Sequence, residues 1–275
     1  MKKFRRRSAR MNLMHYRVLV ARYFRQIFSS LGTLLPLVLQ APVMLVIVWL
    51  VSQKDAFTLK SPDALTGANV TLFMLVIMSA LMGILNSYRE ICKERDVLSR
   101  EVFGGLDVSA YALSKFCVLA LVGIVQCSVL LFGTALYSPF NFSAPVPDFL
   151  LCLAALILTN LSVTAIGLFL SALLKKSESA ILPVLLIIIM QVVFSDGVLV
   201  LDGAAGYIKY ITPSAWGIAV FGNVCGLNGW LPAEIFHRAM FGYSPLISLA
   251  ALALLTILFV FLTVFVLKRR YRGKE

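Results

Sequence analysis

The sequence has few charged residues for its length. Asp, Glu, Lys and Arg make up 14% of its 275 residues, against about 25% in soluble domains. Apolar residues make up 60%, against about 45–50% in soluble domains. A soluble fold of this size has no interior large enough for that apolar surface, and disordered chains are poor in apolar residues. Both classes are therefore excluded, and the remaining class is a protein that crosses a membrane several times.

The sequence also lacks the motifs of common active sites. It has no Gly-x-x-x-x-Gly-Lys-Ser/Thr loop to bind nucleotide phosphates, no Gly-x-Ser-x-Gly elbow and no His-Glu-x-x-His zinc motif. Its two histidines, His15 and His237, lie far apart in the sequence, and its five cysteines show no CxxC spacing. We therefore expect no catalytic residue, no metal site, no disulfide and no cofactor in this chain.

Six apolar stretches are long enough to cross about 30 Å of hydrocarbon as helices, which takes about 20 residues each. They are Thr33–Ser52, Val70–Tyr88, Phe116–Tyr137, Phe149–Leu174, Ala180–Leu201 and Leu246–Leu267. Asp196 is the single charged residue within them, and a charge at the bilayer centre costs about 2.5–3.5 kcal/mol. We predict an all-α polytopic membrane protein with six transmembrane helices over residues 33–275. We interpret Asp196 as a turn or outer-gate residue, with a proton relay as the alternative.

The basic residues indicate the orientation of these spans. Alternating spans place 21 of the 25 Lys and Arg on one side, in Met1–Gly32, Arg89–Lys115, Lys175–Ser179 and Lys268–Glu275. The other side has Lys54, Lys60, Lys209 and Arg238. The basic side faces the cytoplasm, so both termini are predicted there, and the net charge of +12 requires no nucleic acid partner. The outer loop 202–245 is apolar enough that we expect part of it to fold back toward the membrane interface, with Trp216 and Trp230.

Two predicted cytoplasmic segments have helical patterns. In the tail 1–32, Met11–Leu31 has an apolar stripe with its arginines largely off that stripe. This pattern predicts an amphipathic connecting helix on anionic lipid, or one that also packs on a cytoplasmic partner.

The second segment is the loop 89–115, which has eight charged residues between Arg89 and Glu101. We expect ion pairs Glu90–Lys93 and Asp96–Arg100 along a helix that Gly104-Gly105 can end. Its narrow apolar line is formed by Ile91, Leu98 and Val102. A charged helix held between two spans, with an apolar line, is a plausible docking element for a partner.

Three stretches together resemble the ABC-2 type permeases, in their G-subfamily-like branch. The first contains Glu94-Arg95, Arg100-Glu101, Gly105-Leu106, Ser109, Tyr111 and Ser114-Lys115. The second contains Gly167-Leu168, Ser171-Ala172, Lys175–Ala180, Pro183 and Gln191–Gly197, and the third is Ile211–Trp216. The resemblance covers nearly the whole chain. Asp196 departs from it, because the family usually has Phe-Ser-Gly without an acid there.

The resemblance implies the transmembrane subunit of an ATP-driven ABC transporter that exports a lipophilic or amphipathic substrate. It implies a cytoplasmic coupling helix between the second and third spans that contacts an ABC ATPase subunit, where ATP and Mg²⁺ bind. The candidate contact residues are Lys93, Glu94, Arg95, Arg100, Glu101 and Phe103. It also implies a second permease subunit, identical or different, with the substrate cavity between the two. The candidate cavity residues are Phe73, Met74, Met78, Gln191 and Phe194.

Because the connecting helix follows Met1 closely, we expect a separately encoded ATPase, an arrangement typical of bacteria, and a location in the plasma (inner) membrane. Charge reversal at Arg100 and Glu101 should then uncouple transport and leave membrane insertion intact. Two other functions fit the same sequence. An ion-coupled secondary carrier would work without an ATPase and be sensitive to Asp196→Asn. A membrane scaffold would have no cavity and bind no ATPase.

Overall fold

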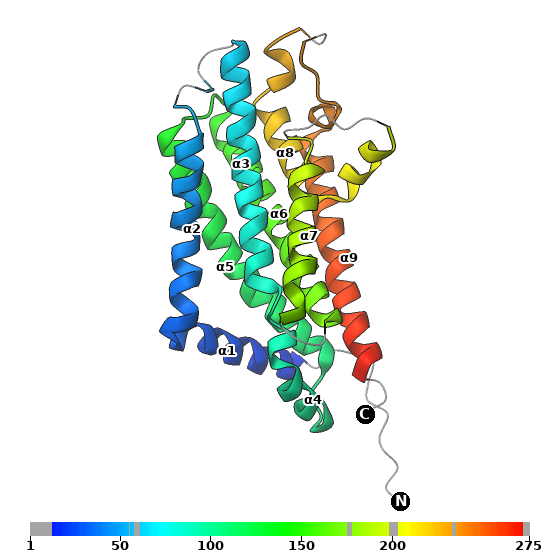
Figure 1. Ribbon diagram of the computed structural model, residues 1–275. Helices are drawn as coiled ribbons and strands as arrows, with labels where there is room; N and C mark the ends of the chain where they lie inside the picture. The colour runs from blue at the N-terminus through cyan, green and yellow to red at the C-terminus, as the bar shows by residue number, and fades with distance from the viewer. Residues whose placement is uncertain are drawn as a thin grey trace, which may run out of the picture.

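The computed structural model describes residues 13–54, 56–57, 61–174, 178–197, 203–232 and 235–271. Within these ranges the chain forms helices and no strands, as predicted, and the long helices run side by side in one bundle (Figure 1). Several predicted features lie outside the described residues. They are the first part of the basic tail (residues 1–12), Lys60, Lys175–Ser177, the segment Val198–Asp202 and the last four residues, 272–275.

Five helices in the described part of the chain are long and apolar enough to cross a membrane. They are α2 (Leu31–Val51), α3 (Pro62–Ser87), α5 (Val108–Tyr137), α6 (Pro145–Leu173) and α9 (Pro245–Tyr271). Two of them, α3 and α5, begin eight residues before their apolar stretches, and polar residues cap both. The Ser61 hydroxyl accepts a hydrogen bond from the Ala64 amide at the start of α3, and the Asp107 carboxylate accepts one from the Ser109 amide at the start of α5.

The predicted fifth span, Ala180–Leu201, is not among these five helices. Its helix, α7 (Ile181–Val193), has 13 residues and is about 20 Å long, which is short of the hydrocarbon thickness. The helix ends at a turn in which Asp196 has a φ of +58°. Figure 1 shows α7 rising beside α3 from the end of the bundle that carries α4, so it takes the chain most of the way across.

The predicted outer loop contains further helices. The 3-10 helix η3 (Gly203–Ile211) leads into α8 (Pro213–Val224), which is followed by two short 3-10 helices, η4 (Leu227–Gly229) and η5 (Ala239–Gly242). Ten consecutive residues of α8, from Pro213 to Gly222, are buried, and α8 packs on α3, α6 and α9. The loop therefore folds back into the bundle itself, and its Trp216 is buried, with the indole N–H donating to the Tyr210 carbonyl at 2.9 Å.

Helices α3 and α6 approach closely through small and polar residues. A Cβ on Gly83 would lie 2.5 Å from the backbone carbonyl oxygen of Asn160, so the two backbones meet there. The Asn160 amide group donates to the Ser79 carbonyl at 2.9 Å, and the Ser79 hydroxyl donates to the Leu156 carbonyl at 2.9 Å. Small residues with interhelical hydrogen bonds are the usual contact between membrane helices.

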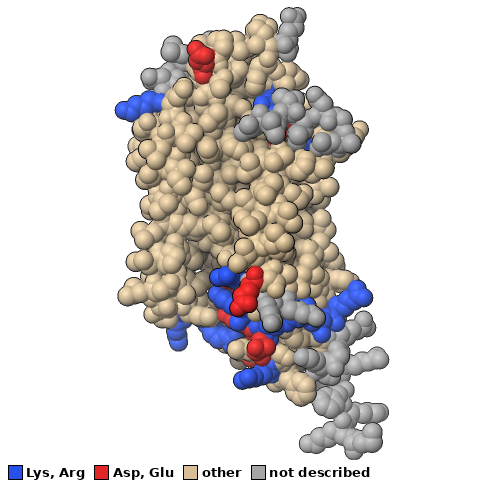
Figure 2. Space-filling model, in the orientation of Figure 1, with Lys and Arg blue, Asp and Glu red and all other residues tan. Residues whose placement is uncertain are grey.

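Two helices lie outside the bundle at one of its ends, which we call the charged end. Helix α1 (Leu13–Ser29) runs across the ends of the long helices, and α4 (Arg95–Phe103) projects below them (Figure 1). In Figure 2 the side chains of Lys, Arg, Asp and Glu gather at this end and more sparsely at the other, and the middle of the face shown has none. This distribution is the one expected for a protein that spans a membrane.

Candidate functional site

Helix α4 is held at the charged end by its apolar line and by α6. Ile91, Leu98 and Val102 are each at most 2% exposed and pack in an apolar cluster with residues of α1, α5, α6 and α9. The apolar line is therefore buried within the chain, and the expectation that it helps to dock a partner is wrong. The Ser171 hydroxyl of α6 accepts hydrogen bonds from the backbone amides of both Ile91 and Cys92 at 3.0 Å. The helix ends at Gly104, as predicted, and Gly105 has a φ of +111°, a conformation that favours glycine.

A buried lysine lies at the centre of the charged end. Lys115, in the first turns of α5, has a side chain that is 3% exposed. Its Nζ is 2.8 Å from Glu94 Oε1, 3.4 Å from Glu90 Oε2 and 3.7 Å from the centroid of the Tyr23 ring. A buried ammonium group is stable only with such partners. We call Tyr23, Glu90, Glu94, Tyr111 and Lys115 the ionic cluster.

The other members of the ionic cluster satisfy the two carboxylates. The Tyr111 hydroxyl donates to Glu94 Oε2 at 2.9 Å, and the Tyr23 hydroxyl donates to the Glu90 carboxylate. Lys93 forms the predicted ion pair with Glu90, so two ammonium groups balance two carboxylates. Helix α1, the segment before α4, and α5 therefore meet in one hydrogen-bonded unit.

The pKa values of two groups reflect this packing. Burial raises the pKa of Tyr23 well above its usual value of 10, and the charge of Glu90 and the hydrogen bond to it raise it further. Burial by itself would raise the pKa of Glu94, but attraction to Lys115 and hydrogen bonds from Lys115, Tyr111 and Gln26 outweigh burial and lower it. At neutral pH Tyr23 therefore keeps its proton and donates a hydrogen bond, and Glu94 is ionised.

Contacts around the ionic cluster extend the same unit. The Arg22 guanidinium of α1 binds Glu101 of α4 through two hydrogen bonds of 2.5 and 3.1 Å. Arg95 donates to the Leu174 carbonyl at 2.5 Å, and Arg270 of α9 donates to the Ala172 carbonyl at 2.5 Å. The last two contacts satisfy carbonyl groups at the end of α6 that have no partner within the helix.

The six residues predicted to contact an ATPase divide into two groups. Glu94, Arg95 and Glu101 have partners within the chain, as described above. Lys93, Arg100 and Phe103 are exposed, although Lys93 is also paired with Glu90, and Phe103 is 78% exposed. The predicted pair Asp96–Arg100 forms no ion pair in the part of the chain that the structure describes. The contact with an ATPase stays a prediction for all six residues.

The five predicted cavity residues lie where α3, α7 and α8 meet. Phe73 and Met78 are 7% and 8% exposed, and Met74 and Phe194 are half-buried. Gln191 holds the start of α8: its side-chain oxygen accepts from the Ser214 amide at 3.1 Å, and its carbonyl accepts from the Ser214 hydroxyl at 2.7 Å. Within one chain these five side chains are packing residues, and their contact with a substrate stays a prediction.

A second buried group of charges lies at the opposite end of the bundle. Asp196 is 3% exposed, and its Oδ atoms are 3.7 Å from Lys209 Nζ and 3.6 Å from an Arg238 guanidinium nitrogen. Arg238 also donates to the Asp196 carbonyl at 2.5 Å. The left-handed backbone of Asp196, which is uncommon for a residue other than glycine, is therefore held in place by the outer loop. Asp196 is a turn residue, as predicted.

The residues that complete both groups of charges have little signal in the sequence. Lys115 belongs to the family-like pair Ser114-Lys115 and to the basic residues of the loop 89–115, but nothing near it indicates its partners. Tyr23 lies in the apolar stripe of Met11–Leu31. The local sequence contains one usable signal for Lys115, because it directly precedes the uncharged stretch Phe116–Tyr137 and so lies close to the membrane boundary. No local pattern relates Arg238 to Asp196, which are 42 residues apart.

Comparison with known proteins identifies relatives of this chain. The family model described as ABC-2 type transporter matches residues 14–225. The ABC transporter ATP-binding/permease protein Rv1747 of Mycobacterium tuberculosis is 27% identical over 212 residues, which cover 72% of this chain and 24% of that protein. The chain thus spans about a quarter of the length of this curated relative. The region matched by the family model begins in α1 and continues to the end of α8. It therefore includes the ionic cluster and α4.

Proposed function

The chain belongs to the ABC-2 type transporter family, and from this membership we propose that it is the permease subunit of an ATP-driven exporter of a lipophilic or amphipathic substrate. In this proposal ATP and Mg²⁺ bind to a separate ATPase subunit, and the chain itself breaks no bond. The charged end faces the cytoplasm, where 21 of the 25 Lys and Arg would lie, and the protein resides in the plasma (inner) membrane of a bacterium.

The observation that carries the proposal is that α4 has two different faces. One face is fixed to the bundle by Leu98, Val102 and the contact between Arg22 and Glu101. The other face exposes Val97 and Phe103, which are 54% and 78% exposed, beside Arg100. An aromatic residue exposed at the tip of a rigid charged helix is a suitable anchor for a protein partner.

The ionic cluster then transmits motion from α4. Glu90 and Glu94 bind Lys115 of α5 and tyrosines of α1 and α5. If the ATPase displaced α4 alone, these buried charges would be separated, so α1 and α5 move with α4. The helices move together as rigid bodies between inward-open and outward-open states. Glu94 and Glu101 act inside this unit, and Phe103, Arg100 and Lys93 form the surface that the ATPase touches.

The substrate path lies between two permease subunits. Apart from the buried Gln191, helix α7 is apolar, and it exposes Leu182, Leu185, Leu186, Ile189 and Met190. A second copy of the chain, or a related permease, packs near this face. The cavity between the two subunits is lined by the exposed side chains of α7 and by the five predicted cavity residues beside them. Methionine and leucine suit an adaptable apolar site.

The experiment tests the exposed face of α4. The tagged full-length permease is expressed with the ATP-binding protein encoded beside it, and both association and ATP hydrolysis in proteoliposomes are measured. Phe103→Ala should weaken association about 30-fold or more, as expected when a central aromatic anchor is truncated, and should remove the stimulation of hydrolysis by the permease.

A matched control separates this effect from a general loss of apolar surface. Phe132 lies in the last turns of α5, at the opposite end of the bundle from α4, and is 55% exposed, so Phe132→Ala removes the same side chain far from α4 and should leave association unchanged. Equal effects of the two variants would contradict the proposal. Transport in vesicles without a nucleotide-hydrolysing partner would favour the ion-coupled carrier.

A further inference from the structure

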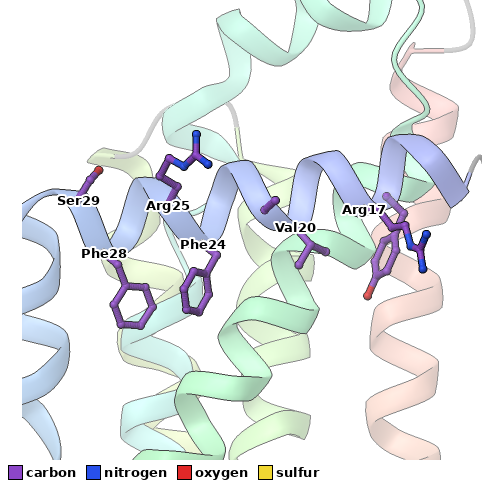
Figure 3. A pocket seen from close by; sticks show the side chains of 8 residues that line it. Arg17, Val20, Phe24, Arg25, Phe28 and Ser29 are labelled. Carbon is purple, nitrogen blue, oxygen red and sulfur yellow. The ribbon is translucent and has the colours of Figure 1, made fainter.

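The outward face of α1 carries a shallow, open groove, and every residue that lines it belongs to α1 itself. The apolar lining is Tyr16, Val20, Ala21, Phe24 and Phe28. In Figure 3 Phe24 and Phe28 point from α1 toward the side on which the spans run, and their rings stack with centroids 4.3 Å apart.

This face is distinct from the face that joins the ionic cluster. Leu19, Tyr23 and Ile27 are buried against the bundle, whereas Phe24 and Phe28 are 44% and 46% exposed. They are exposed at the level where the spans end, which in a membrane is the boundary between hydrocarbon and headgroups. A large apolar surface exposed at this level fits acyl chains better than water.

The charged residues of the groove all have one sign. Arg17 and Arg25 line it, and no carboxylate does. In the described part of the chain neither guanidinium forms an ion pair, whereas Arg22 of the same helix is neutralised by Glu101. Figure 3 shows Arg17 toward one end of the groove and Arg25 toward the other, near Phe28. The Arg25 side chain points to the opposite side of α1 from the aromatic rings.

We propose that this groove binds an anionic glycerophospholipid of the cytoplasmic leaflet as a resident ligand. The stacked rings of Phe24 and Phe28 contact an acyl chain, and Arg17 and Arg25, about 12 Å apart along α1, supply positive charge at the two ends of the headgroup region. Guanidinium groups bind phosphate through charge-assisted hydrogen bonds, and a zwitterionic lipid would add no net negative charge beside them. Helix α1 would then be held by the ionic cluster on one face and by lipid on the other. This inference does not depend on the nature of the transported substrate.

The test measures lipid binding to the purified full-length chain by native mass spectrometry. Phosphatidylglycerol and phosphatidylcholine with the same acyl chains are titrated separately. Wild type should prefer phosphatidylglycerol by about fivefold for each of the two arginines, or about 25-fold in total. Arg17→Gln/Arg25→Gln should lose this preference, and Arg17→Lys/Arg25→Lys should keep most of it.

The control removes two positive charges from the same end of the protein but outside the groove. Lys268 and Arg269 are exposed in the last turn of α9, and Lys268→Gln/Arg269→Gln should retain the lipid preference. The proposal is overturned if wild type binds both lipids equally, or if this control loses the preference as fully as the groove variant. Retention of a different amphiphile that is lost with Arg17→Gln/Arg25→Gln would also overturn it.

A second variant tests the apolar part and does not depend on the arginine variants folding. Phe24→Ala/Phe28→Ala should weaken the binding of both lipids and leave their ratio near that of wild type, because the acyl chains are common to both. Unchanged binding of both lipids would show that the acyl chain lies elsewhere and would refute the site.

Discussion

Replacement of the buried lysine at the charged end tests the ionic cluster most directly. Lys115→Met keeps a long, unbranched side chain of similar shape, so that packing against Tyr23 and Tyr111 changes little. It removes the charge that lies 2.8 Å from Glu94 and 3.4 Å from Glu90. Two carboxylates would then face each other, with Lys93 as the remaining cation of the described contacts.

The magnitude follows from burial. Removing one partner of a buried ion pair costs about 3–5 kcal/mol. The lower end of this range applies here, because the Glu90 and Glu94 side chains remain 12% and 17% exposed. The pair Arg22–Glu101 provides the contrast: its side chains are 47% and 27% exposed, so Arg22→Gln should cost about 0.2–1 kcal/mol.

The assay is thermal unfolding of the purified protein in detergent, followed by tryptophan fluorescence. A loss of about 3 kcal/mol corresponds to a fall in Tm of about 6–12 °C for a chain of roughly this size. Arg22→Gln should lower Tm by less than about 4 °C. The double variant Lys115→Met/Glu94→Gln should recover part of the loss, because it also removes a carboxylate that has lost its counter-charge.

A Tm of Lys115→Met within about 2 °C of wild type, or equal effects of Lys115→Met and Arg22→Gln, would refute the reasoning. Either result would mean that Lys115 is solvated and that Glu90 and Glu94 are stable without it. Failure of the double variant to recover any stability would show that the loss comes from packing, since the electrostatic cause would have been removed.

Two further substitutions test other parts of the fold. Asp196→Asn leaves the buried Lys209 and Arg238 without their carboxylate and should cost about 3 kcal/mol, measured as a lower Tm and faster proteolysis of the outer loop, whereas Asp63→Asn, at an exposed position, should have no effect. Loss of transport in Asp196→Asn with unchanged Tm would instead favour a proton relay. Gly83→Ala should cost about 1–3 kcal/mol, because the new Cβ would meet the Asn160 carbonyl oxygen at 2.5 Å. Gly242→Ala adds a Cβ that meets nothing within 4 Å, and a Tm as low as that of Gly83→Ala would contradict this account.

The sequence predicted the features that are set by residues close together along the chain, such as apolar spans and helix ends. Five of the six apolar stretches correspond to helices long enough to span a membrane, because the preference for hydrocarbon is a property of each stretch by itself. The end of α4 followed from Gly104-Gly105 for the same reason. Helix α7 covers only part of the stretch Ala180–Leu201, and this has a physical cause: the turn that ends α7 is stabilised by Lys209 and Arg238, which lie outside the stretch that hydropathy measures.

The tertiary structure decided which charges meet and which remain free. Arg22 and Glu101 are 79 residues apart and Lys115 and Glu94 are 21 apart, and their pairing depends on the packing of α1 across the ends of the spans. Nothing in the spacing of Arg17, Arg22 and Arg25 indicates that Glu101 neutralises the middle one. The sequence by itself determined that the chain lies in a membrane and where its basic residues gather. Only the packed helices separated the charges that stabilise the fold from those, on α1 and α4, that are available to lipid and to a partner.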